Sequence, residues 1–145
     1  MLLMTLGLIS FGRAFVFGVS VQEGARQAAR LAASAYTNTA VTLTNDDVLG
    51  RLVAGSNPAL VGCSATAGSQ ACNGSTWSLS VNVLGPSGTS YSSIDAARTA
   101  NDLQGGQVTV TVSGDVSVLP GVTTGAYGLQ LPQIGVQGQS SMVVL

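Results

Sequence analysis

Residues able to do chemistry are few in this sequence. It contains no histidine and two cysteines, and its five basic residues are all arginine, against six acidic residues. General acid–base and nucleophilic catalysis need a base, a nucleophile and an orienting group within hydrogen-bond reach, and this inventory offers no such set. A phosphate-binding loop is excluded as well, because such a loop needs a lysine and the chain has none. We therefore expect no enzymatic activity, no metal site and no cofactor.

Cys63 and Cys72 lie close together in a stretch rich in Ser, Gly and Ala. A zinc site needs more ligands, and a redox pair typically has the spacing Cys-x-x-Cys. The pair is better explained by a disulfide that closes a surface loop, which stabilises a domain by roughly 2–3 kcal/mol. A disulfide indicates an oxidising compartment. Asn73, which begins the triplet Asn-Gly-Ser beside Cys72, is a candidate glycosylation site in the same exposed loop.

Charge is scarce, which limits the classes of partner. Charged residues make up 8% of the chain and the formal net charge is -1. Binding to nucleic acid depends on a basic surface, so no nucleic-acid partner is expected. The polar surface must be built largely from Ser, Thr, Asn, Gln and Gly, which suits an extracellular protein embedded in an assembly.

The N-terminal region, residues 1–36, is a long apolar segment that continues into an alanine-rich amphipathic stretch. A membrane-spanning helix needs about 20 mostly apolar residues, and the segment is long enough. No proline precedes Pro58, so one continuous helix through Tyr36 is predicted. The segment lacks the basic start of a secretory signal peptide, so either the chain is already processed or a short leader precedes Met1.

Small residues recur along this predicted helix at a spacing that lets helices approach closely. Each glycine weakens an exposed helix by up to about 1 kcal/mol relative to alanine, so close packing explains them better than chance. Two interpretations stay open and both can hold: packing between helices of different copies, or packing on the chain's own domain. The candidate assembly positions are Gly7, Gly12, Gly18, Gly24, Ala25, Ala28, Ala29 and Ala32.

Arg13 and Glu23 are further candidates for helix–helix assembly. An arginine at the centre of a bilayer costs about 2.5–3.5 kcal/mol, although a long side chain can reach toward the headgroups. Within one helix the two residues are about 15 Å apart, too far for an ion pair. We expect Arg13 of one copy to pair with Glu23 of another; the alternative is a local pair between Glu23 and Arg26.

The remaining residues, 37–145, are predicted to form a β-rich globular head with a short helix near residues 46–54. Thr44 supplies a polar cap, Asp46 and Asp47 fall in the first turn, where the helix dipole favours acids, and Gly55 ends the helix. The two aspartates are too few oxygen ligands for a calcium site.

Alternating apolar residues predict three strands in the head. The predicted inward-facing residues are Trp77, Leu79, Val81 and Val83; Val108, Val110, Val112, Val116 and Val118; and Val136, Met142 and Val144. The sequence Gly114-Asp115 is a candidate bulge in the second strand, and residues 85–88 form a turn. One-sided alternation is typical of an antiparallel sheet, whose apolar face the amphipathic half of the N-terminal helix would cover. The fold class is therefore α+β, and the segment 91–102 fits either a helical turn or a loop.

Two N-terminal motifs resemble the TadE-like pilin family of tight-adherence (Tad/Flp) type IV pilus systems. They are Ser10–Phe15 (SFGRAF), which closes the apolar segment, and Glu23–Ala33 (EGARQAARLAA), which carries the Ala-Arg-x-x-Ala-Arg pattern. The strand from Gln107 to Val118 and the closing strand through Leu145 fit the family more loosely. Thr5 stands where the family carries a glutamate that pairs with a neighbour's terminal amine.

The resemblance implies a pilin-like fold and a structural role. The protein would be held in the inner membrane by its helix, and pilus assembly machinery would then extract it into an extracellular filament. That filament would be a helical homopolymer with the helices in its core and the β-rich heads outside, used for adhesion or surface attachment.

Two alternatives share the same sequence features. One is a membrane-anchored extracellular binding module that binds ligands through loops such as residues 121–131, and the other is a minor pilin or pseudopilin of a secretion system. Leucine in place of Gly24 or Ala28 is expected to disrupt a filament but not a simple anchor.

Overall fold

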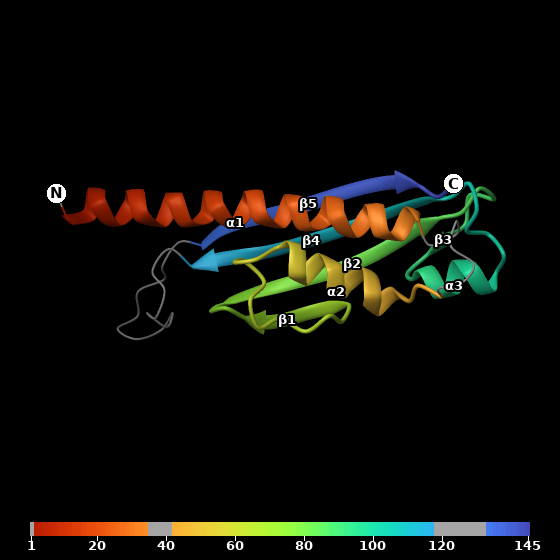
Figure 1. Ribbon diagram of the computed structural model, residues 1–145. Coiled ribbons are helices and arrows are strands. Elements are labelled where there is room, and N and C mark those ends of the chain that lie inside the picture. The colour runs from red at the N-terminus through yellow and green to blue at the C-terminus, as the bar shows by residue number, and fades with distance from the viewer. Residues whose placement is uncertain (1, 35–41, 118–132) are drawn as a thin grey trace.

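The computed structural model describes residues 2–34, 42–117 and 133–145 and confirms the α+β class, with a long N-terminal helix packed on a small antiparallel sheet (Figure 1). In chain order the elements are α1 (Leu2–Ala33), α2 (Asn45–Gly55), β1 (Gly68–Cys72), β2 (Ser75–Leu84), β3 (Ser90–Tyr91), α3 (Ile94–Thr99), β4 (Gln107–Ser117) and β5 (Gln133–Val143). Three positions used in the sequence analysis, Tyr36, Val118 and the loop 121–131, lie outside the described residues.

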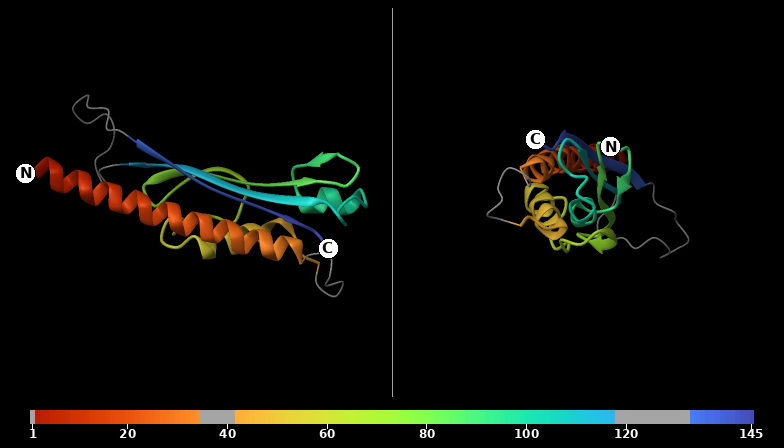
Figure 2. Two further views of the ribbon diagram at one scale, coloured as in Figure 1. Left: turned by 90° about the horizontal axis from the view of Figure 1, so that it is seen from above. Right: turned by 90° about the vertical axis from the view of Figure 1, so that its right-hand side faces the viewer.

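The sheet has five antiparallel strands in the order β1-β2-β4-β5, with the short β3 also paired to β2. Because β4 occupies one edge of β2 along most of its length, β1 and β3 share the other edge, one at each end of β2. Both α1 and α2 lie on the same face of this sheet, which gives two layers (Figure 2). The core lies between these layers.

The predicted inward-facing residues of β2 and β4 are buried. Trp77, Leu79 and Val83 have no exposed surface, and the same is true of Val108 and Val110. Intervening residues carry hydroxyl and amide side chains on the opposite face, as one-sided burial of an antiparallel sheet requires. The alternation prediction is therefore confirmed for the described part of these strands.

The bulge predicted at Gly114-Asp115 is wrong. The register of β4 runs through both residues without a break, and Gly114 lies directly opposite Trp77 on β2. A Cβ atom at position 114 would lie 2.2 Å from Cε3 of the Trp77 ring. Glycine is thus needed here to leave room for the indole, rather than to bend the strand.

Helix α1 divides into two parts with different surroundings. Its C-terminal part packs against α2 and β5 and buries Val21 and Ala29, while its N-terminal part extends beyond the end of the sheet (Figure 1). The helix ends at Ala33, where the Ser34 amide donates to the carbonyls of Arg30 and Leu31. One element thus belongs both to the core of the head and to the exterior.

Helix α2 begins as its sequence predicts. The Thr44 hydroxyl accepts a hydrogen bond from the Asp47 amide, and the Asp47 carboxylate accepts one from the Thr44 amide, which together form a capping box. The Thr44 amide holds the pKa of Asp47 below its usual value. The chain leaves the helix at Ser56, whose amide donates to the Leu52 carbonyl.

Three elements are not predicted by the sequence. Two of them are the strands β1 and β3. The third is α3, which lies in the segment that fits either a helical turn or a loop; it is a helix capped by the Ser93 hydroxyl. The β1–β2 hairpin turns through Asn73 and Gly74, with φ angles of 51° and 70°. Two central residues at positive φ form the turn that favours Asn-Gly, so the signal for β1 was present in the sequence.

Candidate assembly surface on the N-terminal helix

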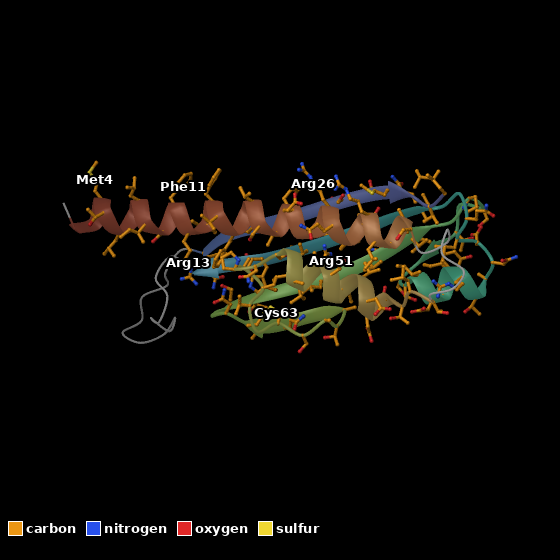
Figure 3. All side chains as sticks on the ribbon, viewed as in Figure 1. Met4, Phe11, Arg13, Arg26, Arg51 and Cys63 are labelled. Carbon is orange, nitrogen blue, oxygen red and sulfur yellow. A yellow bond between two sulfur atoms is a disulfide. The ribbon has the colours of Figure 1, made fainter. Side chains whose placement is uncertain are left out.

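The N-terminal part of α1 carries a set of exposed large apolar side chains, which we call the apolar helix surface: Met4, Leu8, Ile9, Phe11, Phe15, Val16 and Val19. Met4 is 84% exposed and Phe11 is 68% exposed. Spacings of three and four place Met4, Leu8, Phe11 and Phe15 in one row along the helix. Met4 and Phe11 project from the same side (Figure 3).

This surface is too large to be an ordinary feature of a water-soluble exterior. Fully burying one large apolar side chain is worth about 1.5–3 kcal/mol, so covering the whole surface would be worth on the order of 10 kcal/mol. By length and composition the stretch Met4–Ala33 could cross a membrane, a test that signal sequences and core helices also pass. Only 22% of its most apolar stretch is buried inside the protein. Among the described residues, none covers this surface.

A groove adjoins this surface where α1 passes β5, and we call it the Gly18 groove. Among the described residues, a Cβ atom on Gly18 would meet Val136, at 3.9 Å. The Gln22 side chain donates to the Gln139 carbonyl at 3.1 Å and so ties α1 to β5 at this level. The lining residues are Phe15, Gly18, Val19, Gln22, Glu23, Arg26 and Gln137.

Arg13 projects from the side of α1 opposite to Met4 and Phe11 (Figure 3). Its guanidinium carbon lies 5.0 Å from the centroid of the Phe17 ring, a cation–π contact. Phe17 is buried and its ring centroid lies 6.4 Å from that of Trp77. Arg13 thus sits where the apolar helix surface meets the core, and among the described residues no carboxylate lies within ion-pair distance of it.

Glu23 is exposed in the Gly18 groove. Its carboxylate accepts a hydrogen bond from the Gln27 side chain at 3.2 Å. The local pair with Arg26, which the sequence left open, is not formed: in the described part of the chain the ion pair joins Arg98 to Asp95 at 3.6 Å.

Most of the small residues proposed for assembly are buried within the chain's own fold. Ala25, Ala28, Ala29 and Ala32 have no exposed surface, and Gly24 is buried against α2. A Cβ atom on Gly24 would lie 1.9 Å from the Ser56 hydroxyl oxygen and 2.8 Å from the Leu52 carbonyl oxygen. These five residues therefore bring α1 close to its own head.

This placement corrects one expectation. Leucine at Gly24 or Ala28 would disrupt the fold of a single chain, so it cannot distinguish a filament subunit from a membrane anchor. Gly7 and Gly12 differ from Gly24, because a Cβ atom on either would meet no atom of the described residues within 4 Å. They remain available, with Gly18, for contacts outside the chain.

The cysteine pair forms the predicted disulfide, which connects the segment after α2 to the end of β1. Beside it, the Asn73 side-chain nitrogen donates to the carbonyls of Pro58 and Ala59 at 2.9 and 3.1 Å. That nitrogen is the atom a glycan would modify, and attachment there would remove one of these hydrogen bonds. Asn73 thus has a structural role in holding the hairpin to the preceding segment.

At the other end of the head, Asp102 organises the turn after β2. It accepts hydrogen bonds from the Ser87 side chain and from the Tyr91 hydroxyl, the latter at 3.1 Å. The bond from Ser87 holds the pKa of Asp102 below its usual value, while burial and the nearby Asp102 raise the pKa of Tyr91. These groups hold a turn together.

Comparison with protein-family models, curated proteins and solved structures finds no match to this chain. The resemblance to TadE-like pilins therefore rests on the two N-terminal motifs.

Proposed function

We propose that the protein is a structural subunit of an extracellular, Tad-type pilus filament that assembles through α1 and serves adhesion or surface attachment. The observation that carries this proposal is the division of α1. One part is fixed in the core of the head, and the other presents the apolar helix surface, which no described element covers. Copies packed side by side through that surface would bury it and leave the heads outside.

The same surface suits residence in the inner membrane before assembly. From Leu2 to Val19 the helix rises roughly 26 Å, close to the ~30 Å hydrocarbon thickness of a bilayer. Transfer from lipid to a bundle of helices keeps these side chains away from water, so extraction loses little hydrophobic free energy. Extraction itself would be the task of the pilus assembly machinery.

The composition of the head fits the outer shell of such a filament. The sheet face opposite the helices is polar: it carries the exposed Ser78, Asn82 and Gln139, together with the carboxylate of Asp115. The disulfide suits an extracellular location.

Shearing of cells that naturally express the chain, followed by electron microscopy and immunogold labelling, tests the proposal. We expect thin labelled filaments in the sheared fraction. Phe11→Asp should abolish them because it places a charge in the apolar helix surface, and the membrane level of the variant is measured in parallel. Asn82→Asp, which adds the same charge on the exposed sheet face, should leave filaments unchanged.

Wild-type protein found only in membranes, without filaments, would contradict the proposal. A membrane-anchored binding module or a minor pilin would then be the better account.

A further inference from the structure

We propose that the Gly18 groove receives the N-terminal part of α1 from a second copy of this chain, and that Arg13 of the second copy pairs with Glu23 of the first. This inference rests on the proposed function and adds to it the contact surfaces and the axial register between subunits.

Charge complementarity is the first argument. Arg13 is the only charge in the N-terminal part of α1, and Glu23 is the only acid in the whole helix. Burial of Arg13 among apolar helices without a carboxylate would be costly, and its cation–π contact with Phe17 supplies no negative charge. The other acids lie in the head: Asp47 caps α2, Asp102 holds a turn, and Asp46 and Asp115 are exposed on its surface.

Availability of both groups is the second argument. Within the described residues neither Arg13 nor Glu23 takes part in an ion pair. They are about 15 Å apart along one helix, so only an interaction between copies can join them.

Two exposed apolar side chains, Ile9 and Val19, agree with the register that this pair would impose. Ile9 lies four residues before Arg13, on the same side of the helix, and an offset of ten residues brings Ile9 of the second copy to the level of Val19 of the first. Ile9 is 68% exposed and Val19 is 56% exposed, so both are free to make the contact.

The two surfaces lie on different sides of α1. Arg26, which lines the groove, projects with Phe11 from one side, whereas Arg13 projects from the other (Figure 3). A contact between two different surfaces is heterologous, so each copy can receive one neighbour and be received by another. Repetition with an axial step of about 15 Å generates an open filament rather than a closed dimer.

A charge-reversal cycle in the natural cells tests the pair. Arg13→Glu and Glu23→Arg should each lower the filament yield about tenfold or more, because each places like charges together in a desolvated contact. The double variant should restore filaments. Arg30→Glu, an exposed position on the same helix outside the groove, is the matched control and should assemble normally.

Cysteine cross-linking tests the register with both charges in place. A chain carrying Ile9→Cys and Val19→Cys should give a ladder of oligomers after oxidation of sheared filaments. The two positions are about 15 Å apart within one chain, too far for an internal disulfide. Ile9→Cys with Val16→Cys, two positions exposed in the same part of α1, should remain monomeric.

Wild-type filaments combined with no rescue by the double reversal, or with no ladder from positions 9 and 19, would overturn this inference and leave the proposed function intact. Absence of wild-type filaments would overturn both.

Discussion

Gly24 lies where α1 passes closest to α2, and its lack of a side chain is what allows the approach. We predict that Gly24→Ala lowers the free energy of unfolding by about 1–3 kcal/mol, because the added methyl group would overlap Ser56 and the Leu52 carbonyl. Gly12→Ala, whose methyl group meets open space, should instead be neutral or stabilising by up to about 1 kcal/mol. Denaturant unfolding of detergent-solubilised protein measures both, and equal stability of the two variants would contradict the packing described here.

Asp102 gives a prediction about pH. Its pKa in the folded protein lies below the ordinary value of 3.8, chiefly because the Ser87 side chain donates a hydrogen bond to the carboxylate. A depressed pKa contributes stability that is present above pH 3.8 and is lost as the pH falls through the lower folded value. We expect Asp102→Asn to be less stable than wild type at neutral pH. The two melting temperatures should converge on acidification, and a constant difference from neutral pH to below pH 3 would argue against this role.

At the scale of elements, alternation and capping predicted the parts of the fold that bury an apolar face. Strands β2, β4 and β5 and helix α2 followed from such patterns. The apolar pattern does not predict strand β1, because its residues, Gly68–Cys72, are exposed or half-buried and show no apolar alternation. The usable signal is the Asn73-Gly74 turn, which also begins the Asn-Gly-Ser triplet of the candidate glycosylation site.

The small residues of α1 show a limit of inference from sequence alone. Stripes such as Gly24-Ala28-Ala32 have the same pattern whether they contact another copy or the same chain, because close approach of two helices is all they encode. Only the position of α2 and β5 decides between these possibilities. The Gly18 groove could not be predicted at all, since β5 lies far from α1 in the sequence.

The disulfide joins the segment after α2 to the end of β1, and its loss should destabilise mainly that region. We predict that the double variant Cys63→Ser, Cys72→Ser loses roughly 2–3 kcal/mol of stability, since a short loop is no longer closed in the unfolded state. Hydrogen exchange should accelerate in β1 while the C-terminal part of α1 keeps its protection, because that part is held by the core. Uniform acceleration across both elements would show that the disulfide supports the whole head.

At the scale of the molecule, the head and the apolar helix surface have opposite requirements. The described part of the head has a buried core under a sheet whose other face is polar, whereas the N-terminal part of α1 exposes the apolar helix surface. A filament satisfies both requirements at once, because water is excluded from the packed helices at its axis and reaches the heads on its exterior. The central claim is therefore that α1 lies at the axis of an assembly of identical chains.

Electron cryo-microscopy of filaments sheared from the natural cells tests that claim most directly. The account predicts a helical map in which α1 of every copy lies at the centre, the heads lie outside, and Arg13 of one copy reaches the level of Glu23 of its neighbour. Filaments built through contacts between the sheets, with Phe11 and its neighbours left exposed, would contradict the account, as would sheared fractions that contain no filament of this chain.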